Sequence, residues 1–133
     1  MLRIIVALAN AVLVSSMLIA GARAQQPAKP PAIETRKVPG TDNVYIFRNV
    51  NRQSMFIVTE EGVIVTDPVS YGRPTGGQQY LHQIRKVTDK PIKYVIYSHH
   101  HFDHIAGGQV FKDAGATFLA HWRAKERLEQ LKD

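Results

Sequence analysis

The densest concentration of potentially reactive side chains lies in one six-residue segment. His99, His100, His101 and His104 occupy four of its positions, and Asp103 stands among them. Neutral imidazoles and a carboxylate at this density are typical ligands of Zn²⁺, which they bind at ~2.0–2.2 Å. Four ligands divided two and two would hold two metals ~3.5–4 Å apart, with a hydroxide between them. The segment therefore predicts a metal centre.

The spacing of these residues predicts which side chains face the metal. In an extended backbone alternate residues point the same way, so His99 and His101 would face one centre. Asp103 continues the alternation, and we expect the next bend to turn His104 towards the same place. His100 should point away, as a solvated or supporting residue. The alternative, a metal-free surface cluster or a tag, explains neither the interleaved aspartate nor the buried strand that comes before it.

The elements around this segment predict a mixed α/β fold in which helices cover a sheet. A nearly continuous apolar run at 92–97 indicates a buried strand, and its C-terminal end is where ligands usually bind in α/β folds. Gly107 and Gly108 let the backbone turn closely beneath the site. The other predicted elements are an antiparallel meander of strands at 44–47, 54–58 and 62–67, helices at 78–88, 107–113 and 122–131, and a strand at 116–120.

The N-terminal 40 residues divide into two segments of different composition. Residues 1–24 combine a basic start, an apolar run and an Ala22-Arg23-Ala24 site, which is typical of a cleaved signal peptide. Residues 25–40 contain four prolines and predict a linker or extended lead-in. The remainder, 41–133, forms the predicted domain. We therefore expect a periplasmic or secreted protein that meets the membrane only during export; the alternative is an uncleaved membrane anchor.

Composition limits the remaining function classes. The chain contains no cysteine, which excludes disulfides and thiolate ligands, so histidine and carboxylate must hold any metal. The net charge is +6, but the basic residues are scattered, so we expect no nucleic-acid partner. A small-molecule substrate fits better, and the oligomeric state stays open.

The motif resembles the signature of a known family. His99-x-His101-x-Asp103-His104, followed by Gly107-Gly108, is similar to the metal-binding motif of the metallo-β-lactamase superfamily. The strand that ends in Thr-Asp-Pro and the lead-in at 90–96 also resemble that family, and the resemblance covers about 44–131. It implies a four-layer αββα sandwich and a zinc-dependent hydrolase with one or two zinc ions.

The resemblance also implies a role for each matching residue. His99 and His101 would bind the first zinc, and Asp103 and His104 the second. Asp103 would also orient the attacking water, which makes it the predicted catalytic residue. Asp67 would brace the metal-binding loop by hydrogen bonds. His121, at the end of a strand, is expected to be a structural polar residue and not a ligand.

The sequence departs from the family pattern after His104. The family's third histidine, bridging Asp or Cys and last histidine have no counterparts here. We therefore expect the chain to be the N-terminal half of the fold, with an incomplete site. Candidate substrates of the whole protein are esters, lactones, thioesters, amides and sulfate esters. The alternatives are an iron-binding redox member similar to the persulfide dioxygenases and a non-catalytic metal-binding module.

Overall fold

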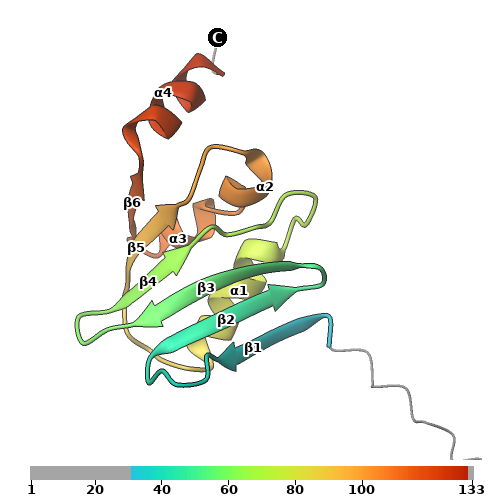
Figure 1. The fold of residues 1–133 in the computed structure, drawn as a ribbon, viewed down its shortest axis with the longest axis vertical. Helices are drawn as coiled ribbons and strands as arrows, with labels where there is room; N and C mark the ends of the chain where they lie inside the picture. Colours follow the sequence, from blue (N-terminus) through green and yellow to red (C-terminus); the bar gives the residue numbers. More distant parts are fainter. Residues whose placement is uncertain (1–30, 132–133) are drawn as a thin grey trace, which may run out of the picture.

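The fold is built on one six-stranded sheet whose strands follow each other in chain order (Figure 1). The computed structural model describes residues 31–131, so the predicted signal peptide at 1–24 lies outside the described residues.

Within 31–131 no helix combines the length and apolarity that a membrane span requires. The strands are β1 (Ile33–Lys37), β2 (Val44–Asn49), β3 (Arg52–Val58), β4 (Val63–Thr66), β5 (Ile92–Tyr97) and β6 (Thr117–Ala120), and the helices are α1 (Gly76–Arg85), α2 (Phe102–Ile105), α3 (Gln109–Asp113) and α4 (Trp122–Gln130).

The sheet has an antiparallel and a parallel part. Strands β1 to β4 pair antiparallel with their neighbours, which confirms the predicted meander. The pairs β4–β5 and β5–β6 are parallel, with α1 in the first connection and α2 and α3 in the second. Parallel strands end at the same edge of the sheet, so the ends of β4 and β5 meet there. This arrangement brings Asp67, just after β4, beside the histidine-rich segment that follows β5.

Strand β1 lies within residues 25–40, which the sequence predicts to be a linker or extended lead-in. Residues 33–37 pair with β2 from Ile33 opposite Asn49 to Lys37 opposite Tyr45. Ile33 packs against the core, whereas the polar residues of this strand reflect its place at the edge of the sheet, where one side stays exposed to water.

The core lies between one face of the sheet and the helices α1 and α3. The fully buried strand residues on this face include Phe47, Phe56 and Val95, and α1 contributes Tyr80. The rings of Phe47 and Tyr80 stack with centroids 4.1 Å apart, and Phe111 of α3 meets Tyr80 edge-on at 5.6 Å. These aromatic contacts fix the two helices on the sheet beneath the predicted metal site.

The opposite face of the sheet is apolar but open. Tyr94, Ile96 and Leu119 of β5 and β6 are 40%, 38% and 44% exposed. The described residues thus form one sheet with its helical layer, which accounts for two of the four layers in an αββα sandwich. Helix α4 projects beyond the end of β6 (Figure 1).

Candidate metal centre

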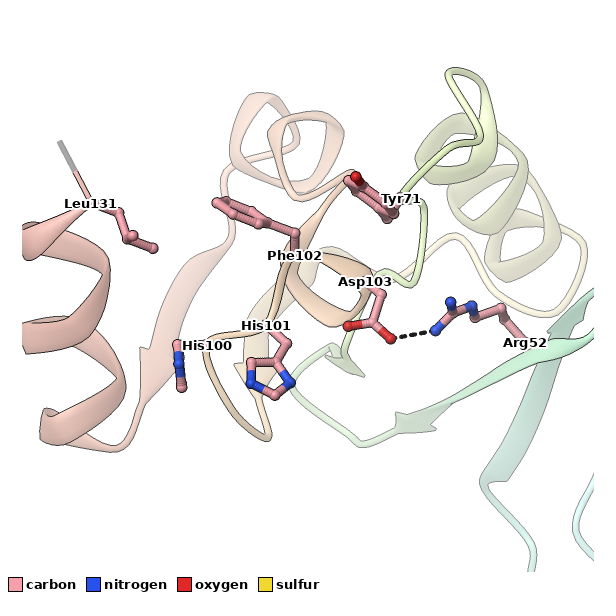
Figure 2. A pocket seen from close by; sticks show the side chains of 7 residues that line it. All are labelled: Arg52, Tyr71, His100, His101, Phe102, Asp103 and Leu131. Carbon is pink, nitrogen blue, oxygen red and sulfur yellow. Dashed lines mark hydrogen bonds and ion pairs between the residues drawn. The ribbon is translucent and has the colours of Figure 1, made fainter.

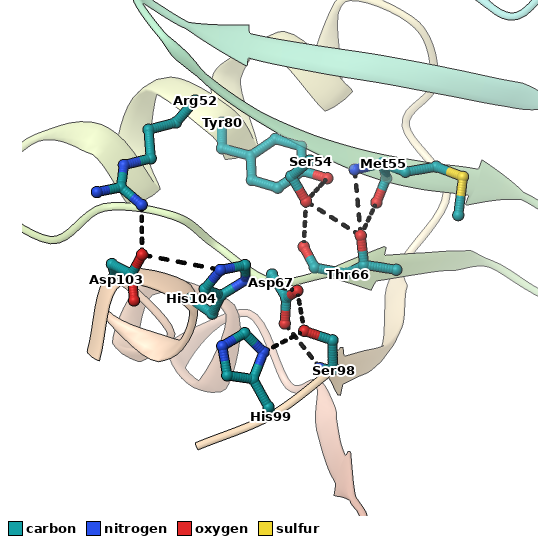
Figure 3. Close-up of polar contacts among 10 residues, drawn as sticks. All are labelled: Arg52, Ser54, Met55, Thr66, Asp67, Tyr80, Ser98, His99, Asp103 and His104. Carbon is teal, nitrogen blue, oxygen red and sulfur yellow. Dashed lines mark hydrogen bonds and ion pairs between the residues drawn. The ribbon is translucent and has the colours of Figure 1, made fainter. Parts of the chain in front are cut away.

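Asp67 lies at the centre of a hydrogen-bond network that joins β4 to the segment after β5 (Figure 3). Its Oδ1 accepts a hydrogen bond from the Ser98 backbone N–H at 2.8 Å, and its Oδ2 accepts one from the Ser98 hydroxyl at 2.6 Å. Nδ1 of His104 lies 3.0 Å from the same Oδ2. A carboxylate can only accept, so His104 carries a proton on Nδ1, and in the neutral ring the lone pair of Nε2 is then available.

The same proton accounting applies to His99. Ser98 Oγ has one proton, which it donates to Asp67. Nδ1 of His99, at 2.9 Å from Ser98 Oγ, must then be the donor in that contact. In the neutral form of both imidazoles the lone pair is therefore on Nε2, which is the nitrogen left to bind a metal.

Three side chains converge at this place. Donor atoms of His99, Asp103 and His104 all lie within 4.8 Å of one another, and the rings of the two histidines are 4.0 Å apart. Two imidazoles and a carboxylate are a donor set that suits Zn²⁺, and small side-chain movements would bring all three onto one ion. The residues present therefore fit the metal that the sequence predicts.

The segment does not stay extended, which corrects the expected alternation. The backbone turns into α2 directly after His101, which is the N-cap residue of this helix. The helical turn places Asp103 and His104 beside His99, while His101 lies outside the convergent set, its ring 4.7 Å from that of His99. The pairing of His99 with His101 on one ion and of Asp103 with His104 on another, including metal binding by His101, stays a prediction.

A cavity of about 510 Å³ opens beside Asp103 (Figure 2). His101 and His100 line it on one side, so His100 contributes to a cavity wall and is not simply solvated. Partial desolvation, together with the charges of His101, Arg127 and His99, lowers the pKa of His100. The remaining lining residues are Arg52, Tyr71, Phe102, Asp103 and Leu131.

Arg52, at the start of β3, forms an ion pair with the predicted catalytic carboxylate. Its guanidinium Nη1 donates to Oδ2 of Asp103. This hydrogen bond, followed by the influence of His104, holds the pKa of Asp103 below its usual range. Sequence reasoning missed Arg52, because no local signal connects a residue at a β-hairpin with one 51 positions later.

The loop that follows β4 holds α2 in place. Backbone N–H groups of Val69 and Ser70 donate to the carbonyls of His104 and Ala106. Gly107 has φ +92, and a Cβ at this position would lie 2.4 Å from Ser70 Oγ. The predicted requirement for glycine after the motif therefore has a physical cause in both backbone conformation and space.

His121 has the structural role expected from the sequence. It is the N-cap of α4, and its Nδ1 accepts a hydrogen bond from the Arg123 backbone N–H at 3.3 Å. Among the described residues it does not belong to the convergent metal-binding set.

Comparison with known proteins assigns the family. The model of the metallo-β-lactamase superfamily matches residues 48–121. A linear primary-alkylsulfatase from Pseudomonas sp. (strain ATCC 19151) is 39% identical over 56 residues, which are 41% of this chain and 10% of the relative. The subclass B3 metallo-β-lactamase of Bradyrhizobium japonicum is 27% identical with a TM-score of 0.59, covering 70% of this chain and 34% of that one. A B3 metallo-β-lactamase with an active-site glutamic acid is 25% identical with a TM-score of 0.60, at 73% and 35% coverage.

The match covers most of the mixed α/β fold, from the end of β2 to the start of α4. The chain belongs to the metallo-β-lactamase superfamily. It spans about a tenth of the length of the curated relative and about a third of the two lactamases.

Proposed function

We propose that this protein is a zinc-dependent hydrolase in which His99, Asp103 and His104 hold the metal, with His101 as a further ligand. The convergence of three donor groups, in which Nδ1 of both histidines is taken up by hydrogen bonds and Nε2 is left for a metal, supports this proposal most strongly. When bound, zinc lowers the pKa of a coordinated water to ~7 and polarises the bond to be cleaved.

The chain's own residues would prepare the reacting groups. Asp67 fixes the protonation of His104 directly and that of His99 through Ser98. Arg52 keeps Asp103 ionised, so the Asp103 carboxylate can accept a hydrogen bond from the attacking water and orient it. The cavity beside Asp103 has the volume of a small-molecule site, and Tyr71 and Phe102 give it apolar walls.

Candidate substrates contain an ester, lactone, thioester, amide or sulfate ester bond. The relatives named above are β-lactamases and an alkylsulfatase, which favours the cyclic amide and the sulfate ester as first substrates to assay. A small molecule is the expected partner, and we propose no role for nucleic acid.

Metal binding is the direct test. His104→Ala should reduce the zinc retained after dialysis, whereas His82→Ala, on the exposed side of α1, should retain as much as the unchanged chain. Elemental analysis of the same samples separates zinc from iron, the metal of the redox alternative. Equal zinc content in both variants would remove the basis of the proposal.

We further propose that activity requires ligands beyond the three that converge here. Metal affinity rises with ligand number and preorganisation, so three donors should hold zinc loosely. The 133-residue chain should therefore hydrolyse no β-lactam, lactone or thioester appreciably, even with added zinc. Turnover that His101→Ala abolishes would show that this chain alone suffices.

We also propose export, with cleavage after Ala24. N-terminal sequencing of periplasmic protein should begin at Gln25. Intact Met1 in the membrane fraction would instead indicate an anchor.

A further inference from the structure

A second, smaller cavity lies on the other side of the histidine-rich segment. Its volume is about 220 Å³, and it lies where the loop after β5 faces the first two turns of α4. Its lining residues are Ser98, His99, His100, His121, Arg123, Ala124 and Arg127.

The positive charge of the lining comes from two arginines, Arg123 and Arg127. Three imidazoles complete the polar part of the lining, and none of the lining residues carries a carboxylate. Arg48 and Arg52, by contrast, form ion pairs with Glu34 and Asp103. Within residues 31–131, the side chains of Arg123 and Arg127 form no ion pair or hydrogen bond with protein groups. No carboxylate among the described residues therefore pairs with these two guanidinium groups, and that of Arg123 lies 5.1 Å from the centre of the Trp122 ring.

Helix geometry gathers this charge in one place. Arg123 and Arg127 are four positions apart, so they lie on the same side of α4, one turn from each other. Ala124, which follows Arg123, is only 7% exposed and also lines the cavity, where its side chain is a single methyl group. His100 reaches the cavity from the opposite wall.

We infer that this cavity binds a small oxyanion of the sulfate, phosphate or carboxylate class. The planar guanidinium matches the oxygen pairs of such anions and makes charge-assisted hydrogen bonds with them. The cavity has room for one oxyanion with a few water molecules, each of which takes ~30 Å³. The anion enters either as a free ion or as the acidic group of a larger molecule. Because Ser98 and His99 belong to both sites, that group would lie next to the predicted metal centre.

The site does not depend on a metal, so it is tested on the full 133-residue chain in the presence of a chelator. Inorganic sulfate and phosphate are titrated into ¹⁵N-labelled protein, with sodium chloride at matched ionic strength as the reference. We expect saturable shifts at the amides of α4 and of the loop after β5. The double variant Arg123→Gln/Arg127→Gln should bind at least roughly tenfold more weakly, since a charge-assisted contact contributes about that factor or more.

The matched control separates the cavity from net charge. Lys112→Gln/Lys125→Gln also removes two positive charges, but from residues that do not line the cavity, and this variant should bind sulfate as the unchanged chain does. Arg127→Lys keeps the charge and should recover part of the affinity. Equal binding by both double variants, or shifts that follow ionic strength alone, would overturn the inference.

A last titration distinguishes the two sources of the anion. Methyl sulfate and an aryl sulfate are compared with inorganic sulfate. Tighter binding of an organic ester would assign the site to the acidic group of a larger ligand, and equal or weaker binding would assign it to a free oxyanion. These titrations are made without metal, so their outcome does not depend on whether His104→Ala loses zinc. This inference and the proposed function can therefore fail separately.

Discussion

Replacing Asp67 by asparagine should weaken both the fold and the metal site. The residue is 9% exposed, and its carboxylate takes part in three polar contacts of 2.8, 2.6 and 3.0 Å. Asparagine keeps the shape and can still accept from the Ser98 N–H. Its amide NH₂ would replace Oδ2, however, and would face two groups that both donate, the Ser98 hydroxyl and Nδ1–H of His104.

The magnitude follows from the contacts that are lost. One or two charge-assisted hydrogen bonds in a buried place correspond to about 2–3 kcal/mol of unfolding free energy. For a domain of this size that is a fall in melting temperature of about 10–20 °C. The asparagine amide also favours a His104 ring that accepts at Nδ1 and is protonated at Nε2. That form has no lone pair for zinc, so zinc affinity should fall by about 10–100-fold.

Thermal unfolding followed by circular dichroism measures the first effect, and competition with a chromophoric chelator measures the second. Asp89→Asn removes an exposed carboxylate that makes no side-chain hydrogen bond or ion pair within 31–131, and should change neither quantity. If Asp67→Asn matched the unchanged chain in both measurements, the bracing role of Asp67 and the proton accounting built on it would be wrong.

Three further perturbations test other contacts. Arg52→Gln removes the main cause of the lowered pKa of Asp103, so NMR titration of the Asp103 carboxyl carbon should show this pKa rising towards its usual range. The control Arg48→Gln removes a different ion pair and should leave the pKa of Asp103 unchanged. If Arg52→Gln caused no rise, the ion pair between Arg52 and Asp103 would be contradicted. Burial raises the pKa of Tyr97 to about 12, so between that value and the unfolded-state value near ~10 the unfolded chain loses its proton first and stability falls with rising pH. Tyr97→Phe should therefore lose less stability in urea unfolding between about pH 9 and about pH 11, and an unchanged loss would refute this. Gly107→Ala should cost about 1–3 kcal/mol more than Gly115→Ala, because both glycines have positive φ but only Gly107 faces Ser70; equal unfolding free energies would show that the contact is unimportant.

Much of the fold could be predicted because the strands carry strong local signals. β2 to β5 are runs of β-branched and aromatic residues between turn-forming clusters, and all four appear within two residues of the expected bounds. β1 was missed because it lies among prolines and has charged residues at its outer edge. Its pairing with β2 is a tertiary contact that no local pattern of 33–37 indicates.

The candidate site was predictable in composition but not in arrangement. The histidine-rich segment and Asp67 followed from motif and strand position, and the structure places Asp67 within hydrogen-bond reach of His104. His99, Asp103 and His104 converge as the motif predicted. The place of His101 outside this set was not predictable, because a four-residue helix begins inside the motif and changes which side chains face each other. Arg52 reaches Asp103 only through the position of the β2–β3 hairpin relative to β5.

The chain-order arrangement of the six strands has a consequence for how the molecule assembles. Every strand pairs only with the strands directly before and after it in chain order, so no pairing has to wait for a strand beyond the next one. In the antiparallel part the strands are joined by short turns, so little loop entropy is lost as they pair. During synthesis each new strand can add to the edge formed by the one before it, from β1 towards β6. A ribosome stalled after β4 should therefore already carry a four-stranded meander, while Asp67 would still await Ser98 and His104, which emerge later. The metal centre would therefore form only after the antiparallel part of the sheet.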